Sequence, residues 1–131
     1  MRVFLDTNVW LSAIVFPGLC SELLTGIIES DHTLLTSALI HTETCDVIRR
    51  KFQRNNQSIA LFEHIWHEAE RVADCVDPID DADARLISAA ITAKAELFVT
   101  GDQRVLGWNP RGDMRIISPR EAWGLLFRPE H

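Results

Sequence analysis

Short apolar runs alternate with longer segments of helical periodicity along the chain. Such runs predict buried strands at Arg2–Leu5, 32–35, 97–100 and Arg115–Ile117, with a further strand edge at 74–76. Apolar residues at helical spacing predict helices over 20–29, from the capping pair Thr36 and Ser37 to about residue 52, over 58–73, over 80–93, and in a short segment from Pro119. Strands and helices therefore follow one another in turn.

This alternation predicts the fold class. Strands separated by helices imply right-handed crossovers, and hence a mostly parallel sheet with helices on both faces. No linker, internal repeat or low-complexity segment divides the chain. We therefore expect an α/β protein with a three-layer α/β/α sandwich, formed by a single domain over residues 1–131. Ligands in such sheets bind beyond the carboxyl ends of the strands, so the residues that follow each strand are of special interest.

The composition fits one globular domain and limits the kind of nucleic-acid surface. The chain is 47% hydrophobic and 24% charged, which is ordinary for a protein with a buried core. Its 13 basic and 19 acidic residues give a net charge of −6. Because binding to phosphates normally rests on Lys and Arg, a broad basic surface for nucleic acid is not expected.

Targeting signals and cysteines indicate the compartment. Asp6 and Asn8 interrupt the apolar N-terminal run and no small-residue cleavage site follows, so we interpret this run as mature sequence. No apolar stretch approaches the roughly 20 residues that span a bilayer. The cysteines Cys20, Cys45 and Cys75 are widely spaced, which indicates neither a disulfide framework nor a zinc site. We expect a cytoplasmic protein that does not bind membranes.

Four acids occupy positions suited to chemistry: Asp6 after the first strand, Glu43 in the second helix, Asp83 at the start of a later helix, and Asp102 after the strand at 97–100. Each has an ordinary structural interpretation as a turn former, a helix-capping acid or part of a solvated face. If they converge, their mutual repulsion calls for a cation, and hard oxygen ligands favour Mg²⁺ or Mn²⁺. One or two such ions promote phosphodiester hydrolysis.

Two segments carry a family resemblance. The first is Leu5-Asp6-Thr7-Asn8-Val9, followed by Ser12-Ala13 and Phe16-Pro17-Gly18; the second runs from Asp83 to Ala90 and continues with Leu97-Phe98-Val99-Thr100-Gly101-Asp102. Together they resemble the PIN domain, spanning nearly the whole chain. The resemblance is strongest to the VapC-type ribonucleases, which are toxin components of toxin–antitoxin modules.

The resemblance implies a divalent-metal-dependent endoribonuclease, with Mg²⁺ or Mn²⁺ as cofactor, RNA as substrate, a cognate antitoxin as partner and a homodimer. Residue by residue, it implies metal ligation by Asp6, Asp83 and Asp102, with Glu43 completing the site or acting as base. Asp46 lies one turn from Glu43 and is an alternative for the helix acid. Thr7 and Asn8 match positions that support the first ligand or face the phosphate. Thr100 would orient Asp102.

Other side chains have weaker assignments. A basic cluster, Arg49, Arg50, Lys51 and Arg54, either complements a helix C-terminus or binds RNA or an acidic partner. Arg104 stands where close relatives often have an acid, and could meet an RNA phosphate. His64 and His67 lack a third metal ligand at suitable spacing, whereas His41 is a candidate for the rim of the site. The apolar stretch 10–16 would suit a homodimer contact.

Two other functions remain open. A haloacid-dehalogenase-like phosphatase also places an Asp after its first strand, but Asn8 replaces the second Asp of that motif. A degenerate PIN module that only binds a partner would retain the fold without catalysis. Assigning the four acids to a metal site changes the charge of the remainder from −6 to −2. We therefore expect weak, metal-bridged binding of RNA.

Overall fold

The computed structural model of the chain describes residues 1–52 and 56–127. Its strands form a parallel five-stranded sheet in the order β3-β2-β1-β4-β5, which makes β1 central. The strands are β1 (Arg2–Leu5), β2 (Thr33–Thr36), β3 (Glu70–Arg71), β4 (Leu97–Val99) and β5 (Arg115–Ile117). Because β1 lies between β2 and β4, the residues that follow β1 and β4 emerge side by side.

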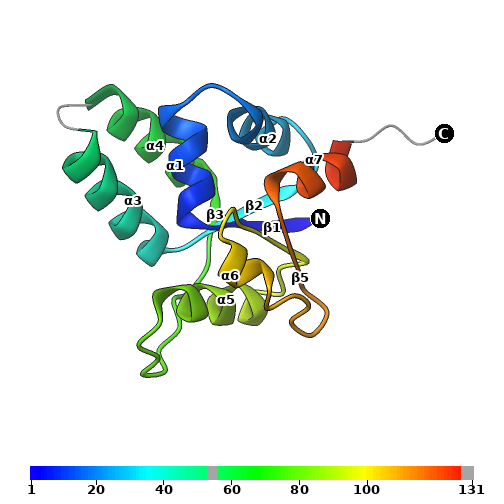
Figure 1. Cartoon of the computed structure of the whole chain (residues 1–131). Coiled ribbons are helices and arrows are strands. Elements are labelled where there is room, and N and C mark those ends of the chain that lie inside the picture. The colour runs from blue at the N-terminus through cyan, green and yellow to red at the C-terminus, as the bar shows by residue number, and fades with distance from the viewer. Residues whose placement is uncertain (53–55, 128–131) are drawn as a thin grey trace.

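Helices cover both faces of the sheet (Figure 1). Helices α1 (Thr7–Val15), α2 (Leu19–Ile28), α3 (Ala38–Lys51), α4 (Asn56–Glu68) and α7 (Pro119–Phe127) lie on one side, and α5 (Ala82–Thr92) and α6 (Gln103–Leu106) on the other. This arrangement is the predicted three-layer α/β/α sandwich with a parallel sheet.

The core forms where the sheet meets the helices. Phe4 and Phe98, on neighbouring strands, stack with ring centroids 5.5 Å apart. Trp10 of α1 packs edge-on against Phe62 of α4 at 5.3 Å, and both side chains are fully buried. The central strands are buried on both faces, which explains why their sequences are continuous apolar runs.

The stretch 10–16 is divided between this core and the surface. Helix α1, which was not predicted, begins directly after β1 and buries Trp10, Ala13 and Ile14 within the chain, whereas Phe16 is exposed. Leu11 and Val15 are half-buried and Ser12 is exposed, so the stretch contributes both to the core and to the surface.

The predicted strand edge at 74–76 is wrong. The pairing partner of β2 is β3, at Glu70–Arg71, and the Val72 amide extends that ladder by donating to the Thr36 carbonyl at 2.8 Å. Residues 74–76 come after this pairing has ended. Asp74 instead accepts a hydrogen bond from the Leu39 amide at 3.3 Å, and Val76 is almost fully exposed.

No single helix in the described ranges is long and apolar enough to cross a membrane. Only α1 and α2 taken together reach the required length and apolarity, and they meet at an angle of 100°.

Candidate functional site

Asp6 stands at the carboxyl end of the central strand, where the chain turns from β1 into α1. Its amide continues the sheet by donating to the Val99 carbonyl at 2.9 Å. Its side chain caps α1, because Oδ1 accepts a hydrogen bond from the Thr7 amide at 2.8 Å. The residue is only 1% exposed, so a carboxylate is held inside the protein at a fixed position.

Side chains from both central strand ends hold the other oxygen of Asp6. The Thr100 hydroxyl donates to Oδ2 at 2.8 Å, and the Asn8 amide group donates to the same oxygen at 3.2 Å. Asn8 is itself fixed, because its Oδ1 accepts from the Gly101 amide at 2.8 Å. Parallel pairing of β1 with β4 brings these residues together across more than 90 positions of sequence.

The surroundings of Asp6 oppose its ionisation. The pKa of Asp6 is raised from 3.8 to about 6, and burial is the largest cause. The neighbouring carboxylates of Asp83 and Glu43 contribute to this rise, and the hydrogen bonds from Thr100 and Thr7 oppose it. Asp6 at the end of β1, Glu43 on α3 and Asp83 on α5 are therefore close enough to interact electrostatically.

Glu43, on α3, belongs to this group, and Asp46 does not. The Thr7 hydroxyl donates to Glu43 Oε1 at 2.9 Å, which joins α3 to the residue after Asp6. Burial raises the pKa of Glu43, and the nearby Asp83 adds to the effect. Asp46 lies on a solvent-exposed face and pairs with Arg50 at 3.0 Å. Of the two acids that the sequence left open, Glu43 is the one that lies near Asp6 and Asp83.

Asp83 forms an ion pair with Arg104, which lies 21 positions later in the sequence. Arg104 Nη2 lies 2.7 Å from Asp83 Oδ2, and Nη1 lies 2.8 Å from Oδ2 of Asp81, the residue that caps α5. The Arg104 guanidinium lowers the pKa of Asp81 and also stands 4.8 Å from the centre of the Trp108 ring. Arg104 thus neutralises part of the acidic cluster that Asp6, Glu43, Asp81 and Asp83 form.

Asp102 is linked to Asp6 through Thr100. Its backbone amide donates to the Thr100 hydroxyl oxygen at 3.1 Å, and its own carboxylate caps the short helix α6 by accepting from the Arg104 amide at 2.9 Å. The half-buried Asp102 lines an open hollow of about 420 Å³ that Asn8 and Ser12 also line. Thr100 therefore accepts a hydrogen bond from the main chain of Asp102 and donates its own hydroxyl hydrogen to the carboxylate of Asp6.

The acids have the chemistry of a divalent-cation site. They offer only hard oxygen donors, and the buried carboxylates of Asp6 and Glu43 have raised pKa values that a nearby cation would lower. Within residues 1–52 and 56–127, no three of these acids have oxygens that all lie within 4.8 Å of one another. Asp6, Glu43 and Asp83 therefore match Mg²⁺ or Mn²⁺ in the type of donor atom, and their carboxylates would have to move closer together to share one ion.

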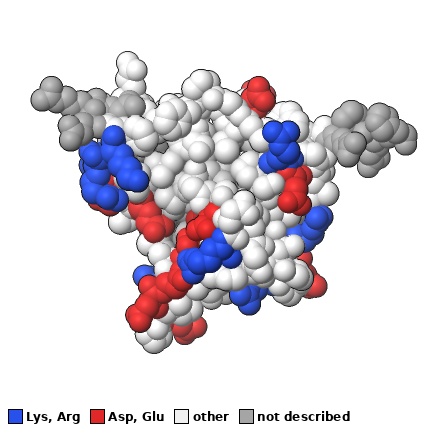
Figure 2. All heavy atoms as spheres, viewed as in Figure 1, with Lys and Arg blue, Asp and Glu red and all other residues white. Residues whose placement is uncertain are grey.

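The predicted basic cluster lies at the end of α3. Arg49, Arg50 and Lys51 are exposed in its last turn, and Figure 2 shows basic side chains gathered at that edge of the molecule, apart from the acids near α5 and α6. Arg54 falls outside the described residues. The cluster begins six residues after Glu43, a distance of about 9 Å along a helix.

Two participants were not predicted from the sequence. Asp81 shares Arg104 with Asp83, and Arg85 is close enough to lower the pKa of Glu43. In the sequence, Asp81 is one acid of a run that suits any helix start. The only sequence signal for Arg85 is its position two residues after Asp83.

Comparison with known proteins supplies the family. The chain matches the family model described as PIN domain over residues 2–104, a range that includes the four acids. No protein of curated function is significantly similar to it in sequence.

Solved structures share its fold at low sequence identity. One is a chain from VapBC2 of Rickettsia felis bound to a DNA fragment from their promoter, with a TM-score of 0.63, 19% identity, and coverage of 90% of this chain and 98% of that chain. Another is the PIN domain endonuclease Utp24, with a TM-score of 0.55, 17% identity and coverage of 89% and 84%. With most of its length matched, the chain belongs to the PIN domain family, a family of nucleases.

Proposed function

We propose that this protein is a divalent-metal-dependent endoribonuclease that hydrolyses RNA phosphodiester bonds. The observation that carries the proposal is the buried Asp6 carboxylate, held by hydrogen bonds from Thr7, Asn8 and Thr100 beside two further acids. Such an arrangement retains an unfavourable buried charge, which a bound cation would compensate. Family membership supports nuclease activity in general, and the metal and the RNA substrate are the specific parts of the proposal.

The ligands would be Asp6, Asp83 and Asp102, with Glu43 completing the site or acting as base. Bound Mg²⁺ or Mn²⁺ would activate water and stabilise the leaving oxygen of the phosphodiester. Thr7 holds Glu43, and Thr100 with Asn8 holds Asp6, so these side chains keep two acids at fixed positions during turnover. Arg104 and the exposed Arg49, Arg50 and Lys51 are proposed phosphate contacts.

The proposal also includes the biological setting. We infer a cytoplasmic toxin that is neutralised by a cognate antitoxin and forms a homodimer. The structural likeness to a chain of VapBC2 supports the toxin–antitoxin assignment through the fold. Because Trp10, Ala13 and Ile14 are buried in the chain's own core, a homodimer contact at the stretch 10–16 would use its exposed positions, such as Ser12 and Phe16.

Cleavage assays test the activity. We expect labelled RNA to be cleaved with Mg²⁺ or Mn²⁺, EDTA to stop the reaction, and Asp6→Asn to abolish it while the circular dichroism spectrum is retained. A phosphomonoester should not be hydrolysed. Hydrolysis of that ester by the wild type would instead indicate a phosphatase. Cleavage of neither substrate by correctly folded protein would point to a module that only binds a partner.

A further inference from the structure

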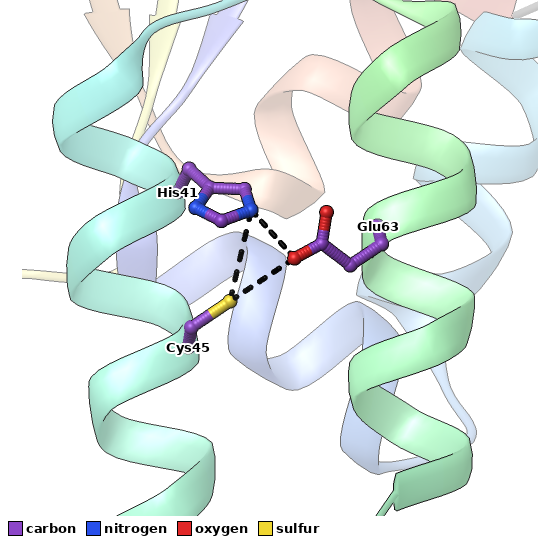
Figure 3. A group of neighbouring side chains, drawn as sticks. All are labelled: His41, Cys45 and Glu63. Carbon is purple, nitrogen blue, oxygen red and sulfur yellow. Dashed lines mark hydrogen bonds and ion pairs between the residues drawn. The ribbon is translucent and has the colours of Figure 1, made fainter.

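A second group of potential ligands lies away from the acidic cluster, between α3 and α4. His41 and Cys45 project from α3 toward Glu63 of α4 (Figure 3). His41 Nε2 lies 2.7 Å from Glu63 Oε1, and the Cys45 sulfur lies 3.9 Å from the same nitrogen and 3.8 Å from the same oxygen. A nitrogen, a sulfur and an oxygen therefore converge on one point.

Packing fixes the side chains that form this cluster. His41 and Cys45 are four positions apart, which places both on the face of α3 that meets α4. The imidazole packs against the rings of Phe62 and Trp66, with centroids 5.6 and 4.8 Å away. The second oxygen of Glu63 is engaged by His67 Nε2 at 3.4 Å, which leaves Oε1 directed at His41 and Cys45.

The geometry does not suit a cysteine nucleophile. A Cys-His-Glu relay uses both ring nitrogens, one toward the thiol and one toward the carboxylate. Here the thiol and the carboxylate both meet Nε2, and Cys45 is only 3% exposed, so a substrate has no access to the sulfur. Convergence on a single point is instead what a shared ion requires.

We propose that His41, Cys45 and Glu63 bind a Zn²⁺-class transition metal ion. Imidazole, thiolate and carboxylate are its usual ligands, and three of them leave a fourth tetrahedral position for water. Zinc bond lengths place tetrahedral ligand atoms about 3.3–3.6 Å apart. The two contacts of the Cys45 sulfur, at 3.9 and 3.8 Å, are slightly longer than that range, and the His41–Glu63 contact of 2.7 Å would have to open by about 0.6 Å. The ion would replace the thiol proton, which would leave to solvent.

Such an ion would connect two helices beside the acidic cluster. Two of its ligands come from α3 and one comes from α4, so the ion would link these two helices. Glu43 also lies on α3, between His41 and Cys45. The bound metal would therefore stabilise the helix that supplies an acid to the nuclease site. It would not replace the nuclease metal, because the acids Asp6, Glu43 and Asp83 offer only hard oxygen donors, whereas this site contains nitrogen and sulfur.

Cobalt substitution tests the site, since Co²⁺ bound to a thiolate gives a charge-transfer absorption band that an all-oxygen site cannot give. Purified full-length protein, reduced and with Mg²⁺ in excess, would be titrated with Co²⁺. We expect the band in the wild type and in Cys75→Ser, which removes another cysteine as a matched control, and its loss in Cys45→Ser. Zn²⁺ should abolish the band by displacement.

Affinity and stability provide independent readouts. His41→Asn and Glu63→Gln should each weaken Zn²⁺ binding by more than about tenfold, measured against a chromophoric chelator, because even groups that only orient a ligand contribute about 10–100-fold. Saturating Zn²⁺ should raise the Tm of the wild type by about 5 °C or more. None of these measurements depends on RNA cleavage, so they separate this site from the proposed nuclease activity.

Contrary results would be clear. A wild type without the band, or a band that persists in Cys45→Ser, overturns the proposal. So does Zn²⁺ affinity that neither His41→Asn nor Glu63→Gln alters. If Cys45→Ser does not fold by circular dichroism, the two variants at partly exposed positions still decide the question.

Discussion

The Thr100 hydroxyl donates a 2.8 Å hydrogen bond to the buried carboxylate of Asp6, joining the ends of two adjacent strands that are 94 residues apart in sequence. Thr100 also accepts a hydrogen bond from the Asp102 amide. A single hydroxyl group therefore sets the position of one proposed ligand and the backbone of another. It also favours the ionised form of Asp6, which burial opposes.

Replacing Thr100 should shift the pH dependence of cleavage. In Thr100→Val the hydrogen bond that lowers the pKa of Asp6 is lost, so this pKa should rise above about 6. A hydrogen bond to a charged group contributes about 1.5–3 kcal/mol, which corresponds to about one to two pH units. We expect the acidic limb of the Mn²⁺-dependent activity profile to move upward by that amount. Thr100→Ser retains the hydroxyl and should behave as the wild type; an unchanged limb in Thr100→Val would contradict the proposed role.

Removing the charge of Asp6 should stabilise the metal-free protein. Because folding raises the pKa of Asp6 from 3.8 to about 6, its contribution favours folding below pH 3.8 and is lost as the pH rises through 6. Asp6→Asn should therefore unfold at higher denaturant concentration than the wild type above pH 6, by up to about 3 kcal/mol, and the difference should vanish near pH 4. Urea unfolding in EDTA measures this. Equal stability at neutral pH would show that Asp6 is not strained by burial.

Glu43 and Asp46 provide a matched pair of acids on one helix. Glu43→Gln removes the carboxylate that Thr7 holds beside Asp83, and should reduce the cleavage rate by 100-fold or more, the order of effect typical of a base or a charge-stabilising group (about 10²–10⁴-fold). Asp46→Asn removes only an exposed pair with Arg50 and should leave the rate within about twofold. Rates at saturating Mn²⁺ test this. Equal losses in both variants would reject Glu43 as the helix acid.

Arg104 should compete with the cation for Asp83. Arg104→Gln removes two ion pairs of an exposed side chain, and such pairs are individually weak. The Mn²⁺ concentration for half-maximal activity should therefore fall by about twofold to tenfold, while the KM for RNA rises if Arg104 contacts phosphate. Titrations of metal and RNA separate the two effects. Arg111→Gln is the control, because Arg111 also lies over Trp108 but has no such pair with Asp83 among the described contacts. A higher metal requirement in Arg104→Gln would contradict competition.

The sequence by itself determined the fold class and the strand ends. The apolar runs at Arg2–Leu5 and 97–100 could only be buried strands in an alternating pattern, and parallel pairing then placed Asp6 and Asp102 at the same edge. Asp83 was singled out at the start of a helix, and its assignment to the site rested on the resemblance to the PIN domain. The strands and their ends could be predicted because they depend on local periodicity, which the sequence shows directly, and on the general geometry of parallel sheets.

Only the tertiary structure decided which side chains meet across elements. Helix α3 presents Glu43 to Thr7 and Asp46 to solvent, a choice that depends on how the helix is rotated against α1. The same rotation turns His41 and Cys45 toward Glu63, so the proposed metal site arises from two helices with no recognisable ligand spacing between them. Such contacts depend on how remote segments pack. The sequence gives the spacing of side chains around a helix, but the packing decides which face of the helix meets which neighbour.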